Sequence, residues 1–252
     1  MPMPNIAWGI TGATDKLEAT FEQMEKVAAM KDVRITTFIS QAGIEIILHC
    51  GLKKRLEAIS DGGPYREICA PKTHGASMYL TGRFFAKEYE ACMVAPCSSN
   101  SLCKLRYGLA DTPVTSAVCW ALKGGCPVFV LQTHLTIAHH DSPLWVRLDE
   151  TVCRRCDDCP PERACKPRAI TRRNKFPSIN LLKCRRCMDC VRACPYNAIV
   201  GKERFRLNKR MVDQEAAEEL SKVRGLAVLK EPREIGQTLE RYCVELPSIR
   251  LD

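Results

Sequence analysis

The first half of the chain alternates between two patterns of apolar residues. Residues 5–10 ("NIAWGI") are a short apolar run followed by a glycine turn, and residues 32–40 ("DVRITTFIS") form a second run that ends at Ser40. Such runs are typical of buried strands, whereas apolar side chains at helical spacing indicate an amphipathic helix. Residues 13–31 have that helical spacing, and their predicted inward face is Leu17, Phe21, Met24, Val27 and Ala28.

The alternation continues toward residue 132. Residues 88–101 predict a strand that runs into a loop, and residues 116–132 predict a helix, a glycine stop and another strand. Strands that alternate with helices predict an α/β domain with a Rossmann-like parallel sheet, whose ligand lies at the carboxyl ends of the strands. Residues 41–59 predict one further helix, with its inward face formed by Ile44, Leu48, Leu52, Leu56 and Ile59.

The predicted strand ends carry small and hydroxyl residues. Gly12 follows the first strand, Ser40 ends the second, and the stretch "PCSSN" at residues 96–100 opens a helix after a later strand. Backbone N–H groups at a helix N-terminus favour an anion such as phosphate. The glycine pattern of dinucleotide sites is absent, and no acidic residue stands where a ribose hydroxyl would need one, so a single phosphate fits better. This favours FMN.

Cysteine is the most informative residue type. The chain has 16 cysteines, and eight of them fall within residues 153–194. A secreted disulfide scaffold would be shorter and poorer in core, so we interpret the other eight as buried free thiols in a reducing cytosol. The clustered ones form two runs, "CRRCDDCPPERAC" and "CRRCMDCVRACP", each beginning with three cysteines at two-residue spacing.

The spacing within these runs favours iron–sulfur clusters over two zinc sites, although the zinc interpretation stays open. Zinc needs two separated cysteine pairs, whereas three cysteines at this spacing can hold three corners of a four-iron cluster. An internal repeat, "CKPRAI" and "CPYNAI", predicts two similar halves. The runs resemble bacterial two-cluster ferredoxins, in which the fourth cysteine of each run binds the other cluster, although the first run has five residues rather than three before its last cysteine. The resemblance implies cluster I at Cys153, Cys156, Cys159 and Cys194, and cluster II at Cys184, Cys187, Cys190 and Cys165.

Net charge and hydropathy indicate which partners the protein binds and where it is located. The net charge is +9, but residues 151–210 alone hold 17 Lys or Arg and five Asp or Glu, which leaves −3 for the rest. Without interleaved aromatics or a known module, this segment does not predict nucleic-acid binding. It is either a solvated surface or a docking face for an acidic electron donor such as ferredoxin, and we favour the docking face. The most apolar stretch, residues 114–130, is too short and interrupted to span a membrane, and no signal peptide is apparent, so we expect a cytoplasmic protein.

Residues 3–135 resemble the flavoprotein family that includes the FMN-binding cysteine decarboxylases, through "GITG", Ser40, a histidine at position 74 and "APCSSNSLCKLRYGLADT". In that family the loop binds the FMN phosphate. This chain departs from it at Ser101, in place of threonine, and at Cys97, which either tunes the flavin or fills space. We interpret the stretch with His134, His139 and His140 as a polar loop, and the alternatives are that it covers the flavin or binds the substrate. The resemblance implies an active-site His74 and FMN contacts from Gly12, Ser40, Cys97, Ser98, Ser99, Asn100 and Asp111.

The fusion of such a domain to two clusters resembles the family of archaeal-type dihydromethanopterin reductases (acceptor) and archaeoflavoproteins. The resemblance implies that electrons enter the clusters singly, collect on FMN and reduce 7,8-dihydromethanopterin, which is an anionic pterin. It also implies a homo-oligomer, either a trimer or a multiple of trimers. The alternatives are an electron-transfer flavoprotein without pterin activity and a flavin-dependent cysteine decarboxylase. We expect a flavoprotein domain at residues 1–145, a ferredoxin-like domain at 146–206 and a C-terminal extension at 207–252 that packs on the others.

Overall fold

A computed structural model describes residues 4–71, 78–133, 139–181, 183–185, 187–206 and 210–242. The chain divides into two compact units. Unit 1 contains residues 1–137 and 208–252, and unit 2 contains residues 138–207. No helix within the described residues combines the length and apolar character needed to cross a membrane.

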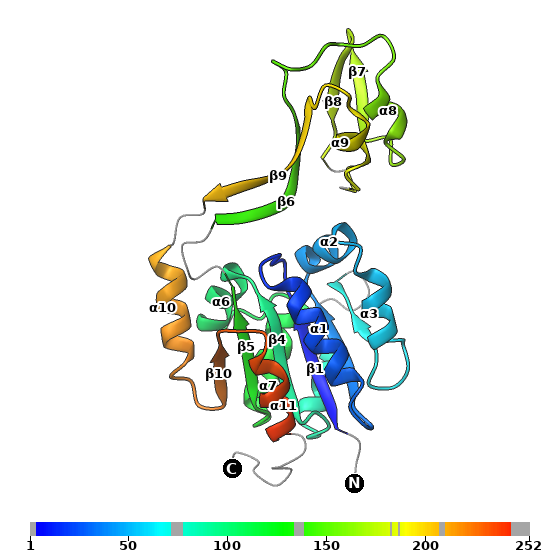
Figure 1. Cartoon of the computed structure of the whole chain (residues 1–252). Helices are drawn as coiled ribbons and strands as arrows, with labels where there is room; N and C mark the ends of the chain where they lie inside the picture. The colour runs from blue at the N-terminus through cyan, green and yellow to red at the C-terminus, as the bar shows by residue number, and fades with distance from the viewer. Residues whose placement is uncertain are drawn as a thin grey trace. The chain divides into compact units, whose positions relative to one another are not determined.

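Unit 1 is built on a six-stranded parallel sheet with the strand order β10-β5-β4-β1-β2-β3 (Figure 1). This confirms the predicted Rossmann-like fold. The two central strands, β1 and β4, are buried along their whole length, because helices cover both faces of the sheet. The strands are β1 (Asn5–Ile10), β2 (Arg34–Ile39), β3 (Ile68–Cys69), β4 (Ala91–Cys97), β5 (Val128–Gln132) and β10 (Leu226–Leu229).

Helices lie on both faces of this sheet. Helices α3 and α11 each contact α1 on one side, whereas α7 packs with α5, η1 and α6 on the other, and α10 packs on α6 (Figure 1). The predicted inward residues Leu17, Phe21, Met24 and Val27 of α1 are all buried. The helices are α1 (Leu17–Ala28), α2 (Gln41–His49), α3 (Lys53–Ile59), α5 (Met78–Thr81), the 3-10 helix η1 (Gly82–Phe84), α6 (Ser99–Arg106), α7 (Pro113–Lys123), α10 (Met211–Leu220) and α11 (Glu234–Glu240).

The single helix predicted over residues 41–59 is wrong. The segment is two helices, because Gly51 adopts a left-handed φ of +72° and the Leu52 N–H donates to the Ile47 carbonyl oxygen, which ends α2. The predicted inward face is wrong in part as well. Leu48 is 54% exposed, whereas Ile46 and Ile47 are buried.

The C-terminal segment of unit 1 completes the sheet. Its strand β10 pairs with β5, and its helix α10 packs on α6. Asp213 lies inside the first turn of α10 and is buried. Its carboxylate accepts hydrogen bonds from the Arg210 guanidinium at 2.6 and 2.9 Å and from the Cys103 thiol of α6 at 3.5 Å. This contact fixes α10 against α6.

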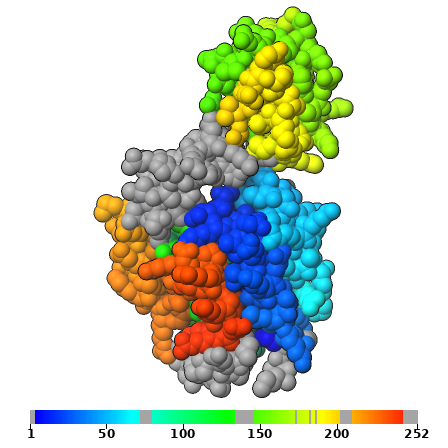
Figure 2. Space-filling model, in the orientation of Figure 1, coloured from blue at the N-terminus to red at the C-terminus, as the bar shows by residue number. Residues whose placement is uncertain are grey.

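Unit 2 contains two antiparallel strand pairs and two short helices. Its small core includes Val146, Ala169, Ile170 and Ile199. Figure 2 shows the two cysteine runs, coloured green and yellow, packed side by side in this unit. The paired strands are β6 (His139–Leu148) with β9 (Ile199–Arg206) and β7 (Ile170–Arg173) with β8 (Phe176–Ile179); the helices are α8 (Pro160–Ala164) and α9 (Asp189–Ala193).

Candidate functional site

The carboxyl ends of β1 and β4 form the point where the sheet changes direction. From β1 the chain moves outward through β2 and β3, whereas β4 and β5 lie on the other side of β1. In sheets of this kind the crevice outside such a switch point binds the ligand. Gly12 and Ser98 follow these two strands directly, and Ser40 follows β2. The structure therefore brings the predicted phosphate-binding residues to one edge of the sheet.

Gly12 is required by a close approach between the turn after β1 and α2. A Cβ atom on Gly12 would lie 2.5 Å from the Cβ of Ala42, a distance that real side chains do not tolerate. Ser40 is the N-cap of α2, and its hydroxyl accepts a hydrogen bond from the Gly43 N–H at 3.0 Å. Both residues therefore fix the entrance of α2 beside the crevice.

The end of β4 is irregular and is held by side chains. Its pairing with β5 shifts register between Val94 and Cys97, so the intervening carbonyl groups leave the ladder. The Trp8 indole N–H donates to the Ala95 oxygen at 2.9 Å. The hydroxyl groups of Thr11 and Thr133 donate to the oxygens of Pro96 and Cys97, each at 2.7 Å.

Thr11 also sets the position of Ser98. Its hydroxyl accepts a hydrogen bond from the Ser98 N–H at 2.7 Å while it donates to Pro96, and it is fully buried. Ser98 is in turn the N-cap of α6 and accepts from the Ser101 N–H at 3.3 Å. The first turn of α6, with Ser99 and Asn100, is therefore held in one orientation with its N–H groups at the sheet edge.

Cys97 lies on the inner side of this segment. Its side chain is fully buried, and the thiol contacts the Ser98 carbonyl oxygen at 3.7 Å. Burial, and to a lesser extent the nearby Cys103, raises the pKa of the Cys97 thiol far above its ordinary value. The thiol is therefore neutral and packs the core between β4 and α7.

Asp111 lies in the loop between α6 and α7. Its carboxylate pairs with Lys104 at 2.5 Å and is 56% exposed. The hydrogen bond from Lys104 lowers the pKa of Asp111, so the carboxylate is ionised at neutral pH. This pair ties the loop to α6. His74 and His134 lie outside the described residues, and only the backbone of His139 and His140 is described, in β6.

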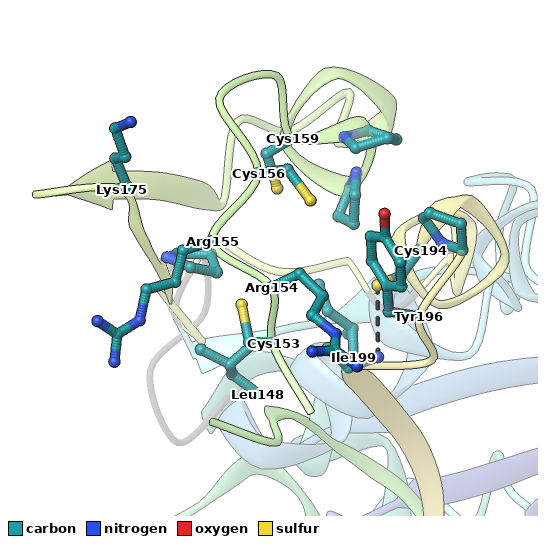
Figure 3. Close-up of a pocket in the computed structure, with 15 residues that line it drawn as sticks. Leu148, Cys153, Arg154, Arg155, Cys156, Cys159, Lys175, Cys194, Tyr196 and Ile199 are labelled. Carbon is teal, nitrogen blue, oxygen red and sulfur yellow. Dashed lines mark hydrogen bonds between the residues drawn. The ribbon is translucent and has the colours of Figure 1, made fainter. Parts of the chain in front are cut away.

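Two cavities of unit 2 are each lined by four cysteines. The first group, Cys153, Cys156 and Cys159 with Cys194 from the other run, surrounds a space of about 380 Å³ (Figure 3). The second group surrounds a space of about 310 Å³ and consists of Cys184, Cys187, Cys190 and Cys165. These are the two groups that the resemblance to ferredoxins implies, including Cys165, despite the longer spacing before it.

The cysteine that crosses to the other run is held in the same way in both halves. The N–H of Ala169 donates to the Cys165 sulfur at 3.2 Å, and the N–H of Ala198 donates to the Cys194 sulfur at 3.3 Å, the dashed line of Figure 3. Hydrogen bonds to cluster sulfurs are one of the features that set a cluster's potential. The internal repeat seen in the sequence is therefore also a repeat of the hydrogen bonds to these two cysteines.

The chemistry of the eight cysteines fits four-iron clusters. Burial raises the pKa of Cys190 to about 11 and also raises that of Cys159, so thiolates here need a cationic centre to stabilise them. Within the described part of the chain, which includes all eight, no three potential ligands converge closely enough to hold a single metal ion. Two spaces lined by cysteine, proline and aliphatic side chains instead suit a larger cluster (Figure 3).

Three residues that shape the site were missed in the sequence. Trp8, Thr11 and Thr133 bind the end of β4 from neighbouring strands. The local sequence offers one weak signal, Thr11 within "GITG". It is weak because a hydroxyl residue at a strand end is common. Their role depends on the register shift in β4, which no local pattern predicts.

Comparisons with known proteins agree with both sites. The family model "Flavoprotein" matches residues 1–142, and the model "4Fe-4S binding domain" matches residues 176–199. A dihydromethanopterin reductase (acceptor) from Methanosarcina mazei is 35% identical over 93% of this chain and 98% of its own length. One from Methanocaldococcus jannaschii is 32% identical over 91% of this chain and 93% of its own length.

A solved structure shares the fold of the whole chain. DmrB from Burkholderia xenovorans in complex with FMN, described as a cubic protein cage for redox transfer, superposes with a TM-score of 0.56 over 99% of each chain. Its sequence is 15% identical, so the likeness supports the fold alone.

Proposed function

The chain belongs to the flavoprotein family and to the group of dihydromethanopterin reductases (acceptor), and on this premise we propose that it reduces 7,8-dihydromethanopterin to tetrahydromethanopterin. It is an iron–sulfur flavoprotein oxidoreductase with FMN and four-iron clusters as cofactors. The observation that carries the proposal is the pair of cavities with four cysteines each, in one chain with a phosphate-type crevice. We assign the first cysteine group to cluster I and the second to cluster II.

The residues at the sheet edge would hold FMN by its phosphate. Ser98 and the free N–H groups of Ser99 and Asn100 begin α6, where the helix dipole favours an anion. Gly12 and Ser40 would hold the start of α2 beside the crevice that the flavin occupies. FMN, when bound, supplies the conversion between single electrons and the electron pair that a C=N bond takes up.

The reduction of a C=N bond takes up two electrons and two protons: one proton would reach the carbon together with the electron pair, and the other would reach the nitrogen. We propose that the proton for the pterin nitrogen comes from His74, which occupies the position of the family's active-site histidine, or from water. The anionic groups of the substrate would be held by basic side chains. Clusters held in a basic unit would accept electrons from an acidic donor such as ferredoxin. We further propose a homo-oligomer, a trimer or a multiple of trimers, in line with the cage described for DmrB.

A single-turnover experiment tests the proposal. The anaerobic protein is reduced chemically, excess reductant is removed, 7,8-dihydromethanopterin is added and the flavin absorbance is followed. Prompt flavin reoxidation with formation of tetrahydromethanopterin supports a pterin reductase, and His74→Ala then tests the proton donor. A flavin that stays reduced with the pterin but is reoxidised by ferredoxin would contradict it and make the chain an electron carrier.

A further inference from the structure

We propose that electrons enter the protein at the second cysteine group, through a surface that docks an acidic protein electron carrier. The surface consists of the exposed ligand Cys187, the cations Lys166, Lys183 and Arg185, and the apolar side chain of Leu181; we call it the entry surface. The inference rests on the proposed function for the assignment of the two clusters, and it adds which cluster meets the donor and by which residues.

The first argument is exposure. Cys187 is exposed, whereas none of the four cysteines of the first group is: Cys153 and Cys156 are half-buried, and Cys159 and Cys194 are buried. Within unit 2, a docked carrier would therefore come nearest to iron at Cys187.

The second argument is that the first cysteine run balances part of its own charge. It contains three arginines, two aspartates and one glutamate. Its acids are held by neighbouring cations in the same unit: Asp157 pairs with Lys175 at 2.5 Å, Asp158 with Arg163 at 3.1 Å, and Glu162 with Arg172 at 2.5 Å. Two of these cations lie outside the run, so Arg154 and Arg155 remain exposed with no carboxylate within ion-pair distance among the described residues. This side of unit 2 therefore keeps a positive excess, but a smaller one than the second run and its neighbours carry.

The second run has an excess of positive charge. It contains three arginines and one aspartate, and Lys166 and Lys183 each stand next to a cysteine of the same group. Lys166, Lys183 and Arg185 are exposed, and none of them lies within ion-pair distance of a carboxylate among the residues that the structure describes. Asp189 accepts the Arg192 guanidinium at 2.5 Å and also interacts electrostatically with Lys166, so it offsets only part of the positive charge around the second group.

The third argument is the apolar contact beside these cations. Leu181, two residues before Lys183, is 46% exposed. Transient redox complexes bury small interfaces, and an apolar centre with a charged rim is the usual anatomy of such a patch. Cations around an apolar residue, next to a cluster ligand, fit an acidic protein rather than a neutral small molecule.

The electron balance of the step is simple. A one-electron carrier is oxidised by one electron, cluster II is reduced by one electron, and no bond is formed or broken. Two such encounters deliver the electron pair for one pterin. Because the partners have opposite charge, the encounter rate should be high at low salt and fall as salt screens the charges.

The test uses the full-length protein loaded with iron and FMN, and a purified acidic two-cluster ferredoxin as the probe. The variant Lys166→Glu/Lys183→Glu/Arg185→Glu alters the entry surface. The matched variant Arg154→Glu/Arg155→Glu/Arg163→Glu makes the same change of charge on the first run. Iron content is measured in both, and cluster reduction by reduced ferredoxin is followed by stopped-flow absorbance across a salt series. The affinity for oxidised ferredoxin is measured by calorimetry.

We expect the entry-surface variant to be reduced by ferredoxin at least about tenfold more slowly at low salt, with a flattened salt dependence and weaker binding. The matched variant should change by less than about threefold, since only overall steering is altered. Methyl viologen radical, which is cationic, should reduce both variants at least as fast as the wild type. Equal slowing of both variants, slowing of the matched variant alone, or no slowing in either would overturn the proposal.

This result is independent of the pterin. A protein that fails to turn over dihydromethanopterin with viologen as donor would refute the proposed function, while the ferredoxin reduction rates would still decide where electrons enter. Conversely, pterin turnover with viologen combined with equal slowing of both variants would refute only the entry surface.

Discussion

The substitution Thr11→Val tests how the phosphate-binding loop is held. Valine has nearly the shape of threonine, so the packing around this fully buried residue is preserved while its hydroxyl is removed. Two hydrogen bonds of 2.7 Å are lost, one to the Pro96 oxygen and one from the Ser98 N–H. The Pro96 oxygen keeps a backbone bond from the Thr11 N–H at 3.3 Å, whereas the Ser98 N–H loses the partner described here.

The expected cost follows from these contacts. A buried group left without its partner costs about 1–3 kcal/mol. With one such group and one weakened carbonyl, the free energy of unfolding of unit 1 should fall by roughly 2–3 kcal/mol. Because the displaced Ser98 N–H begins α6, the Kd for FMN should rise by about tenfold or more, which corresponds to ~1.4 kcal/mol or more.

The assay combines urea unfolding, followed by tryptophan fluorescence, with FMN titration of the apoflavin form. Thr11→Ser keeps the hydroxyl and loses one methyl group, so it should cost no more than ~1 kcal/mol and bind FMN nearly as the wild type does. Thr20→Val is the matched control, because the Thr20 hydroxyl is buried without a hydrogen-bond partner among the described residues. If Thr11→Val unfolds and binds FMN as Thr20→Val does, the argument for the loop is wrong.

Three further predictions follow from the two sites. Cys194→Ala should lower the iron content from about eight to about four per chain and leave the second cluster intact in the electron paramagnetic resonance spectrum; loss of all iron or none would contradict the grouping. Gly12→Ala should weaken FMN binding strongly in fluorescence titrations, because the new Cβ would lie 2.5 Å from that of Ala42; unchanged affinity would show that the turn can yield. Burial works to raise the pKa of Glu67, but hydrogen bonds, chiefly from Arg83, outweigh it and the pKa is lowered. Ionised Glu67 therefore stabilises the folded state at pH values above its unfolded-state pKa, and this contribution is lost as the pH falls through the lower folded-state pKa. Glu67→Gln should flatten the dependence of stability on pH below about pH 4.5, measured by thermal melts.

The sequence predicted those features that depend on local patterns. The alternation of strands and helices follows from burial periodicity, so the parallel sheet and the inward face of α1 could be predicted. The cysteine spacing likewise indicates clusters, because a cubane needs three ligands within a short loop. The pairing of Cys165 with the second run is a tertiary feature, and it came only through the resemblance to ferredoxins.

Other features depend on contacts between distant segments. The chain breaks at Gly51, so α2 and α3 do not share one continuous buried face. Leu48 is therefore exposed, although its spacing from Leu52 and Leu56 suggests burial. The hydrogen bonds from Trp8, Thr11 and Thr133 arise because β4 loses register with β5. The β6–β9 ribbon joins residues about 60 apart in the chain, and no local pattern marks either strand as the partner of the other.

The position of unit 2 within the chain sets an order for biosynthesis. Strand β10 pairs with β5, yet the 70 residues 138–207 of unit 2 separate the two segments that build this edge of the sheet. At roughly 5–20 residues per second, a ribosome needs several seconds to make that insertion. During that time β5 is an open strand edge, a template for unwanted pairing. The cysteines are thus synthesised before the strand that closes this edge of the flavin-binding sheet, so β5 is the edge that needs protection during synthesis.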